Sequence, residues 1–157
     1  MKISFRSVGK TNEAYVNDGI SDFTKRIGRY FPVEWKFYPV PKNSQHLPTE
    51  GQKKKEAEMI LSTIHPDDFL VVLDENGKQF NSVALAKFLQ ARANESRKQV
   101  IFLIGGAFGV ADAVLQRADF TWSLSKLVFP HQLVRLILAE QVYRACTILN
   151  NEKYHHE

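Results

Sequence analysis

The sequence predicts an α/β protein whose parallel sheet is covered by helices on both faces. Segments with the pattern of strands alternate with segments with the pattern of helices along the chain. Two of the strands, residues 69–75 and 99–106, are almost entirely apolar, which is typical of parallel strands buried on both faces. The length of 157 residues and the hydrophobic content of 44% fit a single domain with a sizeable core.

The first forty residues predict a strand, a helix and a second strand. Alternating apolar residues over residues 2–8 indicate a short strand, which Gly9 ends. Asn12 is placed to cap a helix whose apolar residues recur every three or four positions. These apolar residues are Val16, Ile20, Phe23 and Ile27. Gly28 ends this helix, and residues 33–38 alternate in polarity, as a half-buried strand does.

A polar loop over residues 41–48 separates this part from the next helix and strand. Thr49 and Gln52 match a capping box, so a helix is expected from there to about Ile64. The run FLVVLDE at residues 69–75 then has the composition of a buried strand.

The middle of the chain predicts a turn, a helix and the second apolar strand. Asn76-Gly77 is expected to turn the chain. Ser82 is expected to cap a helix that ends near Ala93. The strand QVIFLIGG at residues 99–106 follows, and a short helix is expected over 111–118.

The last forty residues predict a strand, a long helix and a polar tail. FTWSLS, residues 120–125, is the strand, and residues 131–149 form a helix that is apolar on most sides. Such a helix must be buried on most sides, either within one domain or, as we favour, partly at a subunit interface. Cys146, in this helix, is the only cysteine, which excludes an internal disulfide and favours a buried thiol in a reducing cytoplasm.

The net charge of +4 is unevenly distributed. Residues 1–60 hold 11 Lys or Arg and 7 Asp or Glu, whereas residues 61–157 hold 10 of each. A polyanion that contacts this part would release counterions, although a basic solvated surface explains the charge equally well. Neither a membrane-spanning run nor an export signal is found, so no membrane association is expected. The basic residues are Lys2, Arg6, Lys10, Lys25, Arg26, Arg29, Lys36, Lys42 and Lys53 to Lys55.

Three segments are candidates for a ligand site, because ligands bind at the carboxyl ends of strands in open parallel sheets. They are Leu73 to Glu75, Gly105-Gly106 and Ser123 to Phe129. The glycine pattern G-G-x-x-G is not the dinucleotide fingerprint, and the chain has no phosphate-binding P-loop sequence. Taken alone, the glycine turn also fits a tight connection without a ligand.

The C-terminal third resembles a known family. The stretch IGGAFG, the stretch SLSKLVFPHQLVRLILAEQVYRA and the ending YHHE resemble the RlmH family of SPOUT RNA methyltransferases. MKISFRSVGK and LDENGK extend the resemblance over essentially the whole chain. It implies one SPOUT methyltransferase domain over residues 1–157, with a parallel sheet and a C-terminal deep trefoil knot. It also implies a homodimer that uses S-adenosyl-L-methionine to methylate N3 of a pseudouridine in 23S ribosomal RNA (pseudouridine 1915 in the family), within the assembled ribosome.

The resemblance also assigns residues to the cofactor. These are Leu73, Gly105, Leu124, Ser125, Lys126, Leu127, Val128 and Phe129. They are mostly apolar or act through the main chain, which suits an adenine ring.

Polar side chains near this site are the candidates for catalysis. His131, Arg135 and His155 are expected to hold the base or its phosphate, and Tyr154 to stack on the base. A frayed terminus is the alternative for the last two. Glu140 and Arg144, four residues apart on a helix, are expected to form a structural pair. No metal site is expected.

Three other functions fit the sequence less well. A SPOUT enzyme could modify another ribosomal RNA nucleotide or a transfer RNA. A ribosome-binding protein without catalysis would not need the glycine turn and the SKLVFPH segment. A nicotinamide-linked oxidoreductase is disfavoured because the fingerprint G-x-G-x-x-G is missing.

Overall fold

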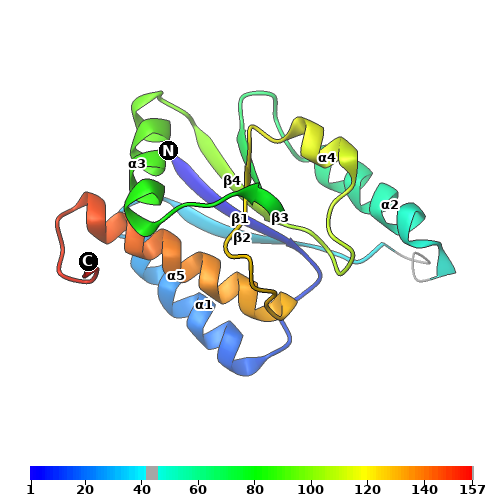
Figure 1. Ribbon diagram of the computed structural model, residues 1–157, viewed down its shortest axis with the longest axis horizontal. Coiled ribbons are helices and arrows are strands. Elements are labelled where there is room, and N and C mark those ends of the chain that lie inside the picture. The colour runs from blue at the N-terminus through cyan, green and yellow to red at the C-terminus, as the bar shows by residue number, and fades with distance from the viewer. Residues whose placement is uncertain (42–45, 157) are drawn as a thin grey trace.

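Five parallel strands form one sheet in the order β2-β1-β4-β3-β5 in the computed structural model, which describes residues 1–41 and 46–156 (Figure 1). The prediction of an α/β fold with a parallel sheet is confirmed. Residues 42–45, half of the loop predicted at residues 41–48 and including Lys42, lie outside the described residues. The strands are β1 (Lys2–Val8), β2 (Val33–Tyr38), β3 (Phe69–Lys78), β4 (Gln99–Ile104) and β5 (Phe120–Trp122).

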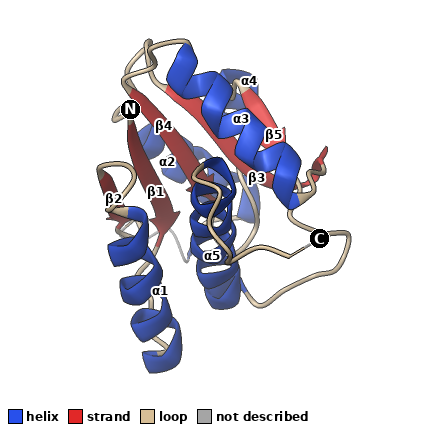
Figure 2. Ribbon diagram, turned by 90° about the vertical axis from the view of Figure 1, so that its left-hand side faces the viewer, coloured by secondary structure: helices blue, strands red, loops and turns tan. Residues whose placement is uncertain are grey.

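Helices cover both faces of this sheet, as predicted. Helices α1, α3 and α5 lie on one face, with α5 between the other two, and α2 and α4 lie on the opposite face (Figure 2). None of the described helices is long and apolar enough to cross a membrane. The helices are α1 (Ala14–Ile27), α2 (Thr49–Leu61), α3 (Ser82–Asn94), α4 (Asp112–Arg117) and α5 (His131–Leu149).

The two faces of the sheet contribute to two separate apolar clusters. Phe5 and Phe102 face α1, α3 and α5, where they are buried together with Leu138. Leu70 and Leu103 face α2 and α4. Side chains of a strand point alternately to the two faces, so a strand covered on both must be apolar throughout. This explains the nearly unbroken apolar runs of β3 and β4.

Two predicted helix caps are wrong. Helix α1 is preceded by Glu13 rather than Asn12, and no side chain caps it. Helix α2 begins with Thr49 itself after Pro48, so Thr49 is inside the helix and does not cap it. Gln52 donates from its amide to the carbonyl of residue 47 at 2.9 Å, which replaces the expected capping box.

The cap of α3 and the turn before it also differ from the prediction. Asn81, not Ser82, caps α3 by accepting from the amide of Ala84 at 2.8 Å. Asn76-Gly77 does not end the strand, since β3 bulges after Leu73 and pairs with β5 again at Lys78. A hairpin turn would require an antiparallel neighbour, whereas β5 is parallel to β3.

Helix α5 has the predicted bounds and is buried along most of its length. Leu138, Val142 and Cys146 are fully buried within the chain. Burial raises the pKa of the Cys146 thiol to about 12, which makes it an unreactive part of the core. The apolar side chains Leu133, Leu136 and Ile137 stay partly exposed on this helix.

Candidate functional site

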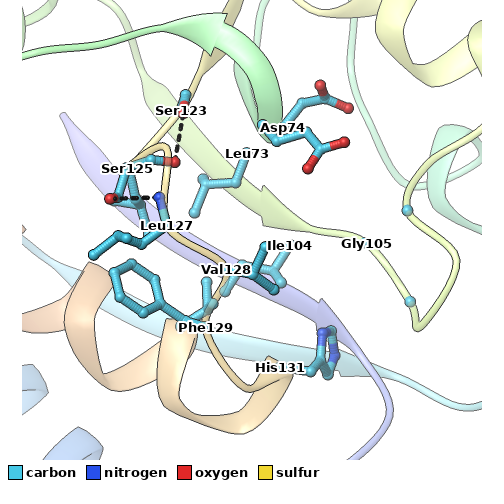
Figure 3. A pocket seen from close by; sticks show the side chains of 15 residues that line it. Leu73, Asp74, Ile104, Gly105, Ser123, Ser125, Leu127, Val128, Phe129 and His131 are labelled. Carbon is cyan, nitrogen blue, oxygen red and sulfur yellow. Dashed lines mark hydrogen bonds between the residues drawn. The ribbon is translucent and has the colours of Figure 1, made fainter.

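The three predicted strand-end segments converge on one cavity of about 220 Å³ at the carboxyl ends of β3, β4 and β5 (Figure 3). Strand β5 ends at Trp122, so the rest of the stretch predicted as strand at 120–125 becomes part of a loop beside this cavity. The lining residues are Leu73, Asp74, Glu75, Ile104, Gly105, Gly106, Gly109, Ser123, Leu124, Ser125, Leu127, Val128, Phe129, His131 and Val134.

Most of the residues that the family resemblance assigned to the cofactor line this cavity. They are Leu73, Gly105, Leu124, Ser125, Leu127, Val128 and Phe129. Lys126 is not among the lining residues, and its side chain is exposed. A role of Lys126 in binding the cofactor stays a prediction.

The glycine turn after β4 is folded tightly on itself. Gly109 donates its amide to the carbonyl of Gly106 at 3.0 Å, and its φ of +82° suits glycine. A Cβ atom on Gly105 would lie 2.6 Å from the Val110 side chain and 3.0 Å from the Gly109 backbone. Glycine is thus needed at position 105 for the turn to close. This turn forms one wall of the cavity.

The loop after β5 forms the opposite wall. Ser125 stabilises it, because its hydroxyl accepts from the amide of Leu127 at 3.0 Å and its carbonyl accepts from the Ser123 hydroxyl at 3.1 Å. Leu127 and Val128 are 72% and 88% exposed, so they present apolar surface next to the cavity. Such a wall offers van der Waals contact and main-chain hydrogen bonds, the combination that binds flat heterocycles.

Two carboxylates lie at the edge of the cavity, a feature that the residue assignment missed. Asp74 and Glu75 follow the buried part of β3 and line the site. Figure 3 shows Asp74 beside Leu73. Asp74 also accepts from the backbone amide of Asn76 at 2.9 Å, which fixes its side chain. The sequence feature that could have identified these two carboxylates is their position directly after an apolar strand. Negative charge here favours a cationic ligand.

His131 is the one imidazole that lines the cavity among the described residues. It lies at the first position of α5, and its Nε2 is 3.2 Å from Nη2 of Arg135. Burial and the positive charge of Arg135 lower the pKa of His131, while a hydrogen bond with the Val8 backbone acts in the opposite direction. The imidazole is therefore held in its neutral form.

Arg135 is fully buried and does not line the cavity. It donates to the Thr11 hydroxyl at 2.8 Å and to the carbonyl of Val8 at 3.1 Å, while burial lowers its own pKa. Its contacts join α5 to the carboxyl end of β1 and hold His131 in place. In this arrangement Arg135 positions another residue and does not reach a ligand itself.

The C-terminal tail packs on the other end of α5. Tyr154 donates to Glu140 at 3.0 Å, and its ring lies edge-on against Tyr143, with centroids 4.7 Å apart. His155 lies 3.3 Å from Arg144, which in turn pairs with Glu140 at 2.7 Å. The Glu140–Arg144 pair is confirmed, and Tyr154 and His155 are packed on α5 rather than frayed.

The tail is far from the cavity of its own chain. Tyr154 contacts Glu140 and His155 contacts Arg144, which lie nine and thirteen residues after His131, or about 14 and 20 Å along the helix. The structure therefore brings His131 and Arg135 together, and Tyr154 and His155 together, but not the two pairs. No cluster of three or more metal-binding side chains is found in the described part of the chain.

Known proteins resemble the chain over its whole length. The family model described as "Predicted SPOUT methyltransferase" matches residues 1–155. A protein named Ribosomal RNA large subunit methyltransferase H from Parabacteroides distasonis is 43% identical over 157 residues, which is 100% of both chains. One of the same name from Cytophaga hutchinsonii is 44% identical over 156 residues, covering 99% of this chain and 100% of its own.

A solved structure agrees in fold. A probable methylase family protein from Haemophilus influenzae Rd KW20 superposes with a TM-score of 0.54 at 11% sequence identity, covering 99% of this chain and 70% of its own. At this identity the likeness concerns the fold alone. The family match over residues 1–155 and the full-length identity of 43% show that the chain belongs to the SPOUT methyltransferase family.

Proposed function

We propose that the protein uses S-adenosyl-L-methionine to methylate N3 of a pseudouridine in 23S ribosomal RNA, as a cytoplasmic homodimer that acts on the assembled ribosome. The observation that carries this proposal is the identity of 43% over the full length with a protein named Ribosomal RNA large subunit methyltransferase H. The nucleotide that the family resemblance implies is pseudouridine 1915. The family also supports a deep trefoil knot at the C-terminal end, which stays a prediction.

The residues of the cavity fit S-adenosyl-L-methionine. Leu124, Leu127 and Phe129 offer apolar contact for the adenine, and the loop backbone offers hydrogen bonds. Asp74 and Glu75 place negative charge where a sulfonium and an ammonium would be favoured. When bound, the cofactor supplies an electrophilic methyl group.

His131 is suited to hold the base next to the methyl donor. Methyl transfer to N3 of a pseudouridine requires that the imide proton leaves, and the positive charge of Arg135 beside His131 favours the anion that results. Burial and the positive charge of Arg135 lower the pKa of His131 and keep it neutral, and the Arg135 guanidinium, 3.2 Å from Nε2, fixes the direction of the ring. Much of the remaining acceleration is expected from alignment of the nucleophile with the methyl group.

A homodimer would bring the tail to the site. Tyr154 and His155 contact Glu140 and Arg144, about 14 and 20 Å along α5 from His131, so a partner subunit is the way for them to reach a base in a cavity. In a two-fold dimer such a contact forms twice, once at each cavity. The partly exposed Leu133 and Ile137 between the two places provide apolar surface for the interface.

Mass mapping of large-subunit RNA from a strain that lacks this gene tests the proposal. The expected result is that the pseudouridine of that RNA loses one methyl group. A plasmid copy of the gene should restore the methyl group, and a His131→Ala copy should not. An unchanged modification pattern in the deletion strain would refute the proposed function, and a change in transfer RNA instead would identify a different substrate.

A further inference from the structure

A groove between α1 and the edge strand β2 has the features of a surface that binds unpaired nucleotides. It has a volume of about 590 Å³ and lies outside the cavity described above. Its lining combines a helix face with the outer part of the sheet, where β2 has a neighbour on one side only (Figure 1). The lining residues are Asn17, Ile20, Ser21, Thr24, Lys25, Val33, Trp35 and Phe37.

Two aromatic rings form a stacking platform in this groove. Trp35 and Phe37 are stacked at a centroid distance of 5.5 Å with an interplanar angle of 11°. The Trp35 ring is held in place, because it packs against Phe5 and its Nε1 donates to the Thr24 hydroxyl at 3.0 Å. Phe37 is 38% exposed and so leaves part of its ring available to a further flat group. Such platforms bind bases without regard to sequence.

The charge of the groove suits a phosphate backbone. Lys25 is the one charged residue in its lining, and Arg29 follows four residues later, both exposed. Within the described residues neither of them forms a salt bridge, whereas nearby Arg26 pairs with Asp22 at 3.1 Å. Polar side chains of Asn17 and Ser21 lie beside them as hydrogen-bonding groups. The positive charge thus remains available to an anion.

The groove is physically connected to the cavity. The guanidinium carbon of Arg135 lies 5.6 Å from the centre of the Phe37 ring. Arg135 also contacts His131, whose side chain lines the cavity. An RNA strand with a base stacked on Phe37 would therefore pass close to the cavity where the target base would be methylated.

We infer that the α1–β2 groove holds unpaired nucleotides of the substrate RNA that flank the target base, stacked on Phe37 with a phosphate at Lys25. This inference rests on the proposed function and adds a second contact surface for the RNA. A protein segment added to the open edge of β2, or a second copy of the chain, is the competing occupant.

Binding of the full-length protein to ribosomes from the deletion strain tests this inference. Phe37→Leu keeps an apolar side chain but removes the ring, and should weaken binding about tenfold, as expected for the loss of one stacked base. Phe37→Trp keeps a ring and should bind like the wild type. Lys25→Ala should flatten the plot of log affinity against log salt by about 0.7, and the matched control Lys98→Ala, an exposed lysine that does not line the groove, should not.

Three outcomes would overturn the inference. The first is that Phe37→Leu and Lys25→Ala both bind ribosomes with wild-type affinity. The second is that Lys98→Ala changes the salt dependence of binding as much as Lys25→Ala does. The third is that Phe37→Leu converts the dimer to a monomer in sedimentation. Calorimetry with S-adenosyl-L-methionine should give the wild-type affinity for every variant that folds. If the wild-type protein itself transfers no methyl group to these ribosomes, the proposed function fails, whereas an active wild type with unaffected variants refutes the groove alone.

Discussion

Replacement of Gly105 by alanine should weaken cofactor binding through the shape of the glycine turn. The added Cβ would lie 2.6 Å from Cγ1 of Val110 and 3.0 Å from the backbone of Gly109. Val110 is 8% exposed and belongs to the apolar cluster under α2, so it cannot simply turn away. Overpacking of this kind costs about 1–3 kcal/mol. Every 1.4 kcal/mol corresponds to about a tenfold change in affinity, so a loss of about 5- to 150-fold is expected.

Calorimetric titration with S-adenosyl-L-methionine measures this loss, and circular dichroism checks that the fold is kept. Ala107→Val is the matched control, because the Ala107 side chain is exposed in the same turn and should tolerate the added bulk. Adding Val110→Ala to Gly105→Ala removes the closest clash and should restore part of the affinity. An unchanged affinity of Gly105→Ala would refute the assignment of this turn to the cofactor site.

Three further predictions concern the rest of the molecule. Ile137→Asp should raise the dissociation constant of the dimer at least about 100-fold, because an unpaired buried charge costs several kcal/mol. A wild-type protein that light scattering shows to be monomeric at micromolar concentration would contradict this. His131→Ala should lower the rate of methyl transfer by about 100-fold or more at unchanged cofactor affinity. Because the pKa of His131 is lowered, wild-type activity should persist below about pH 6.5 and fall only at more acidic pH. The free energy of unfolding should also decrease below about pH 6.5, because the imidazole of residue 131 takes up a proton in the unfolded chain before it does so in the folded one. If the activity of the His131→Ala variant falls at the same acidic pH, His131 does not have this role. Deletion of residues 154–157 should abolish methyl transfer but not cofactor binding, and full activity of the truncated protein would remove the tail from the site.

The architecture could be predicted from the sequence because β3 and β4 are apolar throughout and the remaining segments alternate with helices. The convergence of Leu73, Gly105 and the loop after Trp122 followed from the rule that ligands bind at the carboxyl ends of parallel strands. The identity of the cofactor came from the resemblance, since apolar loops and backbone groups do not distinguish one heterocycle from another.

Local details were harder to predict because they depend on tertiary contacts. Asn76-Gly77 has the sequence of a turn, but the backbone of Thr121 lies so close to Gly77 that a Cβ there would be 2.6 Å from its carbonyl oxygen. Glycine is needed at this place for close approach of two strands. Ser82 and Asn81 are both good capping residues, and only the packing of α3 on α5, where Ser82 donates to Gln141 at 3.0 Å, decides between them.

Arg135 shows a different limit of prediction from sequence. Its position four residues after His131 correctly indicated that the two share a helix face. Its contact with the Phe37 ring and its hydrogen bonds with Thr11 and Val8 involve residues that are 98 to 127 positions away in the sequence. The local sequence around an arginine therefore does not distinguish an exposed side chain that binds phosphate from a buried side chain that positions an imidazole.

Transfer of a tritiated methyl group to ribosomal substrates is the decisive test of the proposed function. Three substrates are compared: intact ribosomes from the deletion strain, ribosomes from a strain that lacks the pseudouridine at the target position, and free large-subunit RNA. The account predicts stoichiometric incorporation into the first, mapped by mass spectrometry to N3 of the pseudouridine, and much less into the ribosomes that carry uridine. Equal incorporation into uridine-containing ribosomes, or none into any substrate, would contradict it.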